Sequence, residues 1–170
     1  MALAKTQASL VGVGYSKMSV AERDYKLDVS EFYLRLTTES IRLFSNKVRA
    51  ICGLRDMIDG RVAAAPLLPQ FYNKADMCEH LAIIPTNGDI TLKFTILETS
   101  AVTIESAAEM LQKSMGQSVA FADALSLLMY DFIVDENKTE VLTKLGLSPE
   151  QAESYRKILK KAPSNVVPFK

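Results

Sequence analysis

The pattern of apolar and polar residues divides the chain into a short beginning without helical periodicity and a long helical remainder. Within residues 1–27, the patch Leu10–Tyr15 has an apolar side chain at every second position, as strands do. Gly12 and Gly14 lie inside this patch and weaken a strand. We therefore expect residues 1–27 to form an N-terminal arm or an edge strand, and residues 28–170 to form one helical domain.

A long helical pattern begins at Asp28, whose spacing to Glu31 is that of a capping box, with Ser30 as the alternative cap. Its apolar residues form one stripe: Ile41, Phe44, Val48, Ile51 and Ile58. We expect the helix to end at Gly60. A helix of that length would span about 45 Å, more than a compact domain of this size needs, so we also expect a kink or a division near Gly53.

The sequence then predicts a β-hairpin insertion at residues 81–97, after a proline-containing connection at residues 62–75. Its two strands, Leu81–Ile84 and Ile90–Leu97, flank an Asn-Gly pair that suits a tight turn. Because two strands alone are marginally stable, their apolar face should lie on helices or gain a third strand. The N-terminal patch or residues 166–169 could supply that strand.

Most of the remaining chain has helical periodicity. Helices are expected over residues 100–115, 119–134, 139–145 and 149–161. The second of these is apolar on nearly all sides, which is typical of a central helix, and Asp135-Glu136-Asn137 should break the chain after it. The last should begin at Ser148, with Gln151 completing a capping box. The fold class is therefore a helix-dominated α+β domain of about five helices and one antiparallel hairpin.

The amino-acid composition and charge exclude some classes of function. The hydrophobic share of 48% and the charged share of 24% are those of an ordinary globular protein. Twenty basic residues offset twenty acidic ones, so nothing attracts the whole chain to nucleic acid or to an anionic membrane. No apolar segment predicts a membrane span or a secretory signal. We interpret Cys52 and Cys78 as reduced thiols. We expect a cytoplasmic protein that does not bind membranes.

The sequence offers little for catalysis. His80 is the single histidine, and a metal site built on it and Cys78 would need two further ligands. Phosphate-binding glycine motifs are missing. We expect no catalytic residues, no metal and no cofactor.

Basic residues are the better candidates for a binding site. Arg35, Arg42 and Arg49 recur at seven-residue intervals along one side of the first helix. A glutamate three or four residues before each of the first two offers an ion pair. Lys47 and Arg49 have no carboxylate at that spacing, so they should be free to meet an external anion.

The C-terminal unit, residues 139–161, has the outline of a helix-turn-helix. Glu150 and Glu153 stand where a DNA reader contacts bases, so they oppose nucleic-acid binding there. The cations gather at the far end of the last helix: Arg156, Lys157, Lys160 and Lys161. These four are further candidate contacts for a polyanion.

These observations favour a non-enzymatic binding, regulatory or assembly subunit that acts through helix faces and terminal arms. A protein partner or self-association is expected, in an oligomer or a larger complex. The alternative is a nucleic-acid-associated protein that uses Lys47, Arg49 and the C-terminal cations. A small enzyme without a recognisable motif is the third hypothesis.

Overall fold

The computed structural model describes residues 20–144, 148, 150 and 151. Strand β1 (Glu22–Val29) is followed by α1 (Glu31–Val48), α2 (Leu54–Arg61), the 3-10 helix η1 (Val62–Leu67), α3 (Leu68–Phe71), α4 (Lys74–Ile83), β2 (Ile90–Leu97), α5 (Glu98–Met115) and α6 (Phe121–Lys144). The helix-dominated α+β class with one antiparallel sheet is confirmed. The expected strands at 10–15 and 166–169 lie outside the described residues. Among the described helices, none is both long and apolar enough to cross a membrane.

The two strands are not a hairpin. β2 lies where the sequence predicts a strand, but it pairs with β1 in an unbroken antiparallel register from Glu22–Leu97 to Val29–Ile90. The predicted strand Leu81–Ile84 is wrong, because these residues form the end and the C-cap of α4. Gly88 does not have a positive φ either. A Cβ atom there would lie 2.3 Å from the carbonyl oxygen of Val29, so close backbone approach is what requires a glycine.

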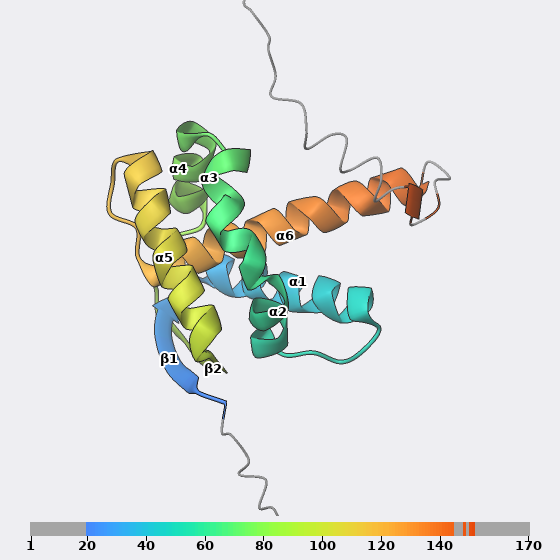
Figure 1. The fold of residues 1–170 in the computed structure, drawn as a ribbon, viewed down its shortest axis with the longest axis horizontal. Coiled ribbons are helices and arrows are strands. Elements are labelled where there is room, and N and C mark those ends of the chain that lie inside the picture. Colours follow the sequence, from blue (N-terminus) through green and yellow to red (C-terminus); the bar gives the residue numbers. More distant parts are fainter. Residues whose placement is uncertain (1–19, 145–147, 149, 152–170) are drawn as a thin grey trace, which may run out of the picture.

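One face of the sheet packs on helices (Figure 1). Tyr25 of β1 stacks between Phe94 of β2 and Phe121 at the start of α6, with ring centroids 5.5 and 4.1 Å away. Val29 and Ile96, from the same face, are completely buried. The sheet therefore gains its stability from burial against helices, as expected for two strands alone.

The first predicted helix is divided near Gly53, as expected. α1 ends at Val48, and Gly53 is the N-cap of α2. Ser30 caps α1, because its Oγ accepts a hydrogen bond from the backbone N–H of Tyr33 at 3.2 Å, whereas Asp28 lies in β1. Gly60 does not end α2, which continues for one more residue.

The connection predicted at residues 62–75 is wrong, because most of it is helical. Pro66 lies inside η1, and Pro69 lies in the first turn of α3. Pro69 loses nothing by lacking a backbone N–H, since a first turn has no intrahelical acceptor for it, and Pro66 stands near the point where the helical type changes from 3-10 to α. Two prolines therefore divide this stretch into short helices without ending helical structure.

α5 ends as predicted at Gly116, which adopts a left-handed conformation with φ 67°. After the next helix begins at Phe121, the predicted break at Asp135-Glu136-Asn137 is wrong, because α6 runs through these residues to Lys144. The predicted capping box beyond it is confirmed. Ser148 Oγ accepts from the N–H of Gln151 at 3.2 Å, and Gln151 Oε1 accepts from the N–H of Ser148 at 2.9 Å.

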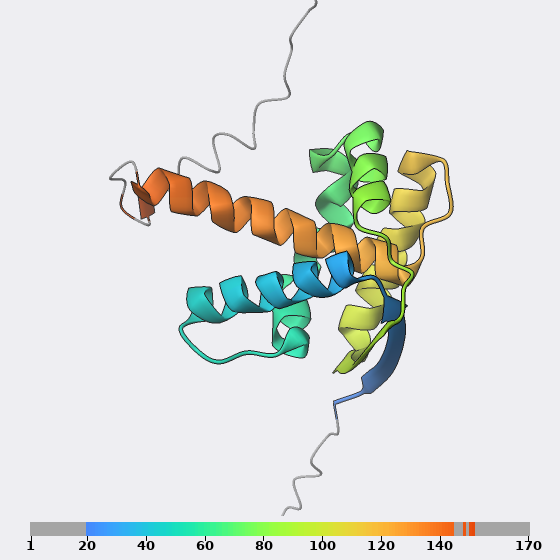
Figure 2. The same cartoon turned by 180° about the vertical axis from the view of Figure 1, so that it is seen from behind.

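α6 is the central helix, with α1 beside it and α3 and α4 on its other side, while α2 lies next to α1 (Figures 1 and 2). It carries two buried carboxylates one helical turn apart. Arg61, at the end of α2, lies 3.3 Å from Asp131 and 3.5 Å from Asp135. The hydroxyl of Tyr72 donates to Asp131 at 3.0 Å. Opposite charge and hydrogen bonding thus offset the cost of burying these acids.

We predict that Arg61→Ala lowers the free energy of unfolding by about 3–5 kcal/mol, because Asp131 and Asp135 stay buried with less compensation. Equilibrium unfolding in urea measures it. Arg35→Ala removes an exposed arginine paired only along α1, and it should cost less than about 1 kcal/mol. Equal effects of the two substitutions would contradict a special role for the buried ion pairs.

Candidate functional site

His80 belongs to the core. It is buried on α4, with Nε2 2.9 Å from the Oγ of Ser126 and its ring 4.6 Å from that of Tyr130. Burial lowers its pKa to about 4, so the imidazole is neutral at neutral pH. Cys78 lies two residues away on the same helix, which puts the two side chains on different sides. The described residues contain no group of three or more ligands that could hold a metal ion.

The basic residues of α1 are mostly neutralised. Arg35 pairs with Glu31, and Arg42 pairs with Glu39, as predicted. The prediction that Lys47 is free is wrong, because its Nζ lies 2.6 Å from a carboxylate oxygen of Glu136 on α6. That partner is 89 positions away in the chain, so helical spacing could not reveal it.

Arg49 differs from these three. It is exposed, and its guanidinium makes no ion pair with any other residue that the structure describes. The other predicted polyanion contacts, Arg156, Lys157, Lys160 and Lys161, lie outside the described residues. Of the six predicted contacts, Arg49 is thus the one whose availability the structure supports.

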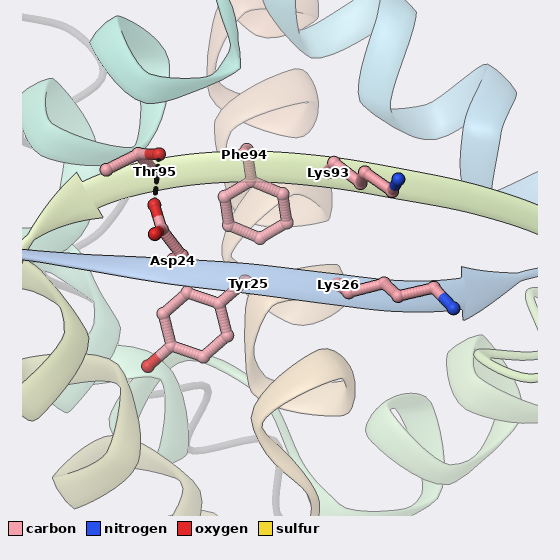
Figure 3. Close-up of a pocket in the computed structure, with 6 residues that line it drawn as sticks. All are labelled: Asp24, Tyr25, Lys26, Lys93, Phe94 and Thr95. Atoms are coloured by element: carbon pink, nitrogen blue, oxygen red, sulfur yellow. Dashed lines mark hydrogen bonds between the residues drawn. The ribbon is translucent and has the colours of Figure 1, made fainter.

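A second basic pair lies on the exposed face of the sheet. Lys26 is directly opposite Lys93, above a hollow of about 430 Å³. Figure 3 shows the two lysines on one side of the aromatic pair and the hydrogen bond from Thr95 to Asp24 on the other. Asp28 also accepts a hydrogen bond from a threonine across the sheet. Two lysines and two aspartates cancel in charge, so this face does not attract a polyanion.

The connection between α1 and α2 is held by its own hydrogen bonds. The N–H of Ala50 donates to the carbonyl oxygen of Ser45, and the N–H of Cys52 donates to the hydroxyl of Ser45, both at 3.1 Å. The N–H of Gly53 donates to the carboxylate of Asp56 at 2.7 Å. Three of its backbone donors are therefore satisfied within the connection and the adjoining helices, which fixes its conformation.

This fixed connection exposes apolar side chains. We use the name α1–α2 corner for the surface formed by Ser45, Asn46, Val48, Arg49, Ala50 and Ile51. Ile51 is fully exposed and Val48 is 46% exposed, although the sequence predicts both within the apolar stripe of the first helix. The division of that helix ends the stripe, so the two side chains do not face the core. The corner contains an open hollow of about 570 Å³.

Arg49 has an unfavourable backbone conformation. Its φ of 57° and ψ of 40° are left-handed, and no other non-glycine residue among those described has a positive φ. A left-handed residue with a Cβ atom costs about 1–2 kcal/mol, which is why glycine usually takes this position after a helix. The arginine side chain is therefore not what the turn requires.

We predict that the stability of the protein falls as the pH is lowered from 6.5 to 4 because of His80. The unfolded state binds a proton near pH 6.5, but the folded state binds it only near pH 4, so the stabilisation is complete above 6.5 and is lost below it. The loss should reach about 3 kcal/mol. His80→Gln should show a smaller change in urea unfolding over the same range, and an equal change would contradict the assignment.

We also predict that Arg49→Gly leaves the protein as stable as the wild type or more stable by up to about 1 kcal/mol. Relief of the left-handed strain offsets the greater freedom of glycine in the unfolded chain. Arg35→Gly is the matched control, because a glycine within α1 should cost about 1 kcal/mol. Thermal unfolding distinguishes the two, and a marked loss of stability in Arg49→Gly would show that its side chain supports the fold.

No protein-family model, curated protein or solved structure matches this chain. The case for a function therefore rests on the contacts, charges and exposure of its own residues. Within the described part of the chain, the α1–α2 corner combines the most exposed large apolar side chain, Ile51, with an exposed arginine, which makes it the candidate site.

Proposed function

We propose that this chain is a non-enzymatic binding subunit that docks a protein partner through its α1–α2 corner, within an oligomer or a larger complex. The observation that carries the proposal is the full exposure of Ile51 on a connection fixed by hydrogen bonds. Covering an isoleucine side chain contributes about 1.5–3 kcal/mol to binding. An ordered connection also loses little conformational freedom when it binds.

The proposed location is the cytoplasm. Cys52 and Cys78 are both free thiols, which supports a reducing compartment.

Nucleic-acid binding is supported less well. Polyanion binding depends on several cations that release counterions together. Arg35, Arg42 and Lys47 each pair with a carboxylate, which leaves Arg49 as the one of these four cations without an ion pair to a described residue. A protein surface suits one cation surrounded by apolar side chains better than a phosphate backbone does.

We predict that Ile51→Asp abolishes binding to the partner without unfolding the protein, because Ile51 makes no contribution to the core. The test compares proteins captured by the wild-type chain and by this variant from cells that make the protein, with light scattering to detect self-association.

Ile83→Asp is the matched control, since Ile83 is also exposed, at 61%, but lies at the end of α4. The expected result is a defined partner, or a second copy, that the wild type and Ile83→Asp bind and Ile51→Asp does not. Identical binding by all three chains, or binding by none, would contradict the proposal.

A further inference from the structure

The α1–α2 corner combines one cation with apolar side chains. Val48, Ala50 and Ile51 present exposed carbon atoms on both sides of Arg49 in the sequence. Together with two polar residues of α1, Arg49 and Ile51 line the same hollow. A ligand that fills this hollow therefore meets a positive charge and an apolar side chain at once.

The charges around the corner favour an anionic group on the ligand. Lys47, two residues before Arg49, is neutralised by Glu136. No carboxylate among the described residues pairs with Arg49, although its guanidinium can donate two parallel hydrogen bonds to one carboxylate. Among the described residues, the guanidinium of Arg49 therefore has no ionic partner, and its positive charge suits an anionic group on a ligand.

The backbone at Arg49 gives a second, independent observation. Its left-handed conformation is one that glycine adopts without strain, and the N–H that follows it is bonded to Ser45 whatever side chain is present. The side chain adds strain to the turn and forms no ion pair within the described chain. Strained residues of this kind gather at ligand-binding surfaces.

Building on the proposed docking function, we propose that the partner presents an acidic, apolar protein segment to the corner. One carboxylate of the segment pairs with Arg49, and an adjacent apolar side chain covers Ile51. Charge complementarity fixes the orientation of such a segment, and burial of the isoleucine supplies most of the affinity. A nucleic acid would satisfy the arginine but would leave Ile51 and Val48 uncovered.

The experiment selects short random peptides displayed on phage against the full-length chain, with the Ile51→Asp variant used to remove unrelated binders. Peptides that depend on Ile51 should carry Asp or Glu next to Leu, Ile or Phe. A synthetic peptide from this set should bind Arg49→Gly roughly five-fold more weakly or worse, which corresponds to about 1 kcal/mol. Arg35→Gly should change its affinity by less than about two-fold.

Exchanging the charges of residue 49 and of the peptide tests whether the two groups pair directly. Arg49→Glu should bind the acidic peptide more weakly than Arg49→Gly does, and a peptide with its acidic residue replaced by lysine should recover binding to Arg49→Glu. Because we predict that Arg49→Gly keeps the stability of the fold, thermal unfolding of that variant is measured alongside, and a loss of affinity without a loss of stability reports on the side chain and not on unfolding.

The outcomes separate this inference from the proposed function. Peptides that depend on Ile51 but lack acidic residues, or that bind Arg49→Gly as well as the wild type, would overturn the inference and leave the docking function standing. Absence of any peptide that depends on Ile51 would overturn both. Binding of labelled single-stranded DNA that requires Arg49 and collapses as salt is raised would overturn the inference in favour of a nucleic acid.

Discussion

The rest of the structure depends on how the charges of two buried carboxylates on α6 are compensated. Asp131 and Asp135 would oppose burial of the central helix if they were alone, because an uncompensated buried charge costs several kcal/mol. Arg61 approaches both of them, and it also lies over the ring of Phe132, 5.0 Å from its centroid. Tyr72 adds a hydrogen bond from beyond α3. This requirement fixes α2, η1 and α3 against one side of α6.

The helices on either side of the α1–α2 corner are both tied to α6 by contacts of their side chains. α1 is held to α6 by the ion pair of Lys47 with Glu136 and by the edge-on contact of Phe44 with Phe132, at 6.0 Å between ring centroids. α2 is held by Arg61. The connection between these two helices is held by hydrogen bonds to Ser45 and Asp56, and Ile51 is fully exposed on it.

Patterns among neighbouring residues predict where helices and strands lie better than they predict which of these elements pack together. The cap of α5 at Gly116, the division near Gly53 and the strand at 90–97 all follow from neighbouring residues, and the structure has them. The strand that pairs with residues 90–97 does not follow from neighbouring residues, because it begins more than sixty residues earlier. Tyr25, Leu27 and Val29 alternate there, but the capping-box spacing of Asp28 and Glu31 predicts the start of a helix at the same place. Pairing across such distances depends on tertiary packing, which spacing along the chain does not reveal.

Ionic side chains near the candidate site show the same limit of prediction from sequence, because their partners are distant in the chain. Asp135 looks like a helix break in the sequence because buried acids are rare, whereas in the structure Arg61 lies 3.5 Å from its carboxylate and helps to offset the cost of burying it. Lys47 looks free because Glu136 is distant in the chain, whereas Arg49 has no carboxylate at helical spacing and forms no ion pair with another described residue. Its left-handed backbone has no signal in the sequence. What makes the corner a candidate site is thus visible only once α1, α2 and α6 are assembled.

The central claim is that the α1–α2 corner meets a protein partner, and photochemical crosslinking tests it most directly. A photoreactive phenylalanine analogue replaces Ile51 in one chain and Ile83 in another, and both are irradiated in the cells that make the protein. We expect one discrete adduct, with a partner or a second copy, from position 51 and none of the same mass from position 83. No adduct from position 51, or the same adducts from both positions, would contradict it.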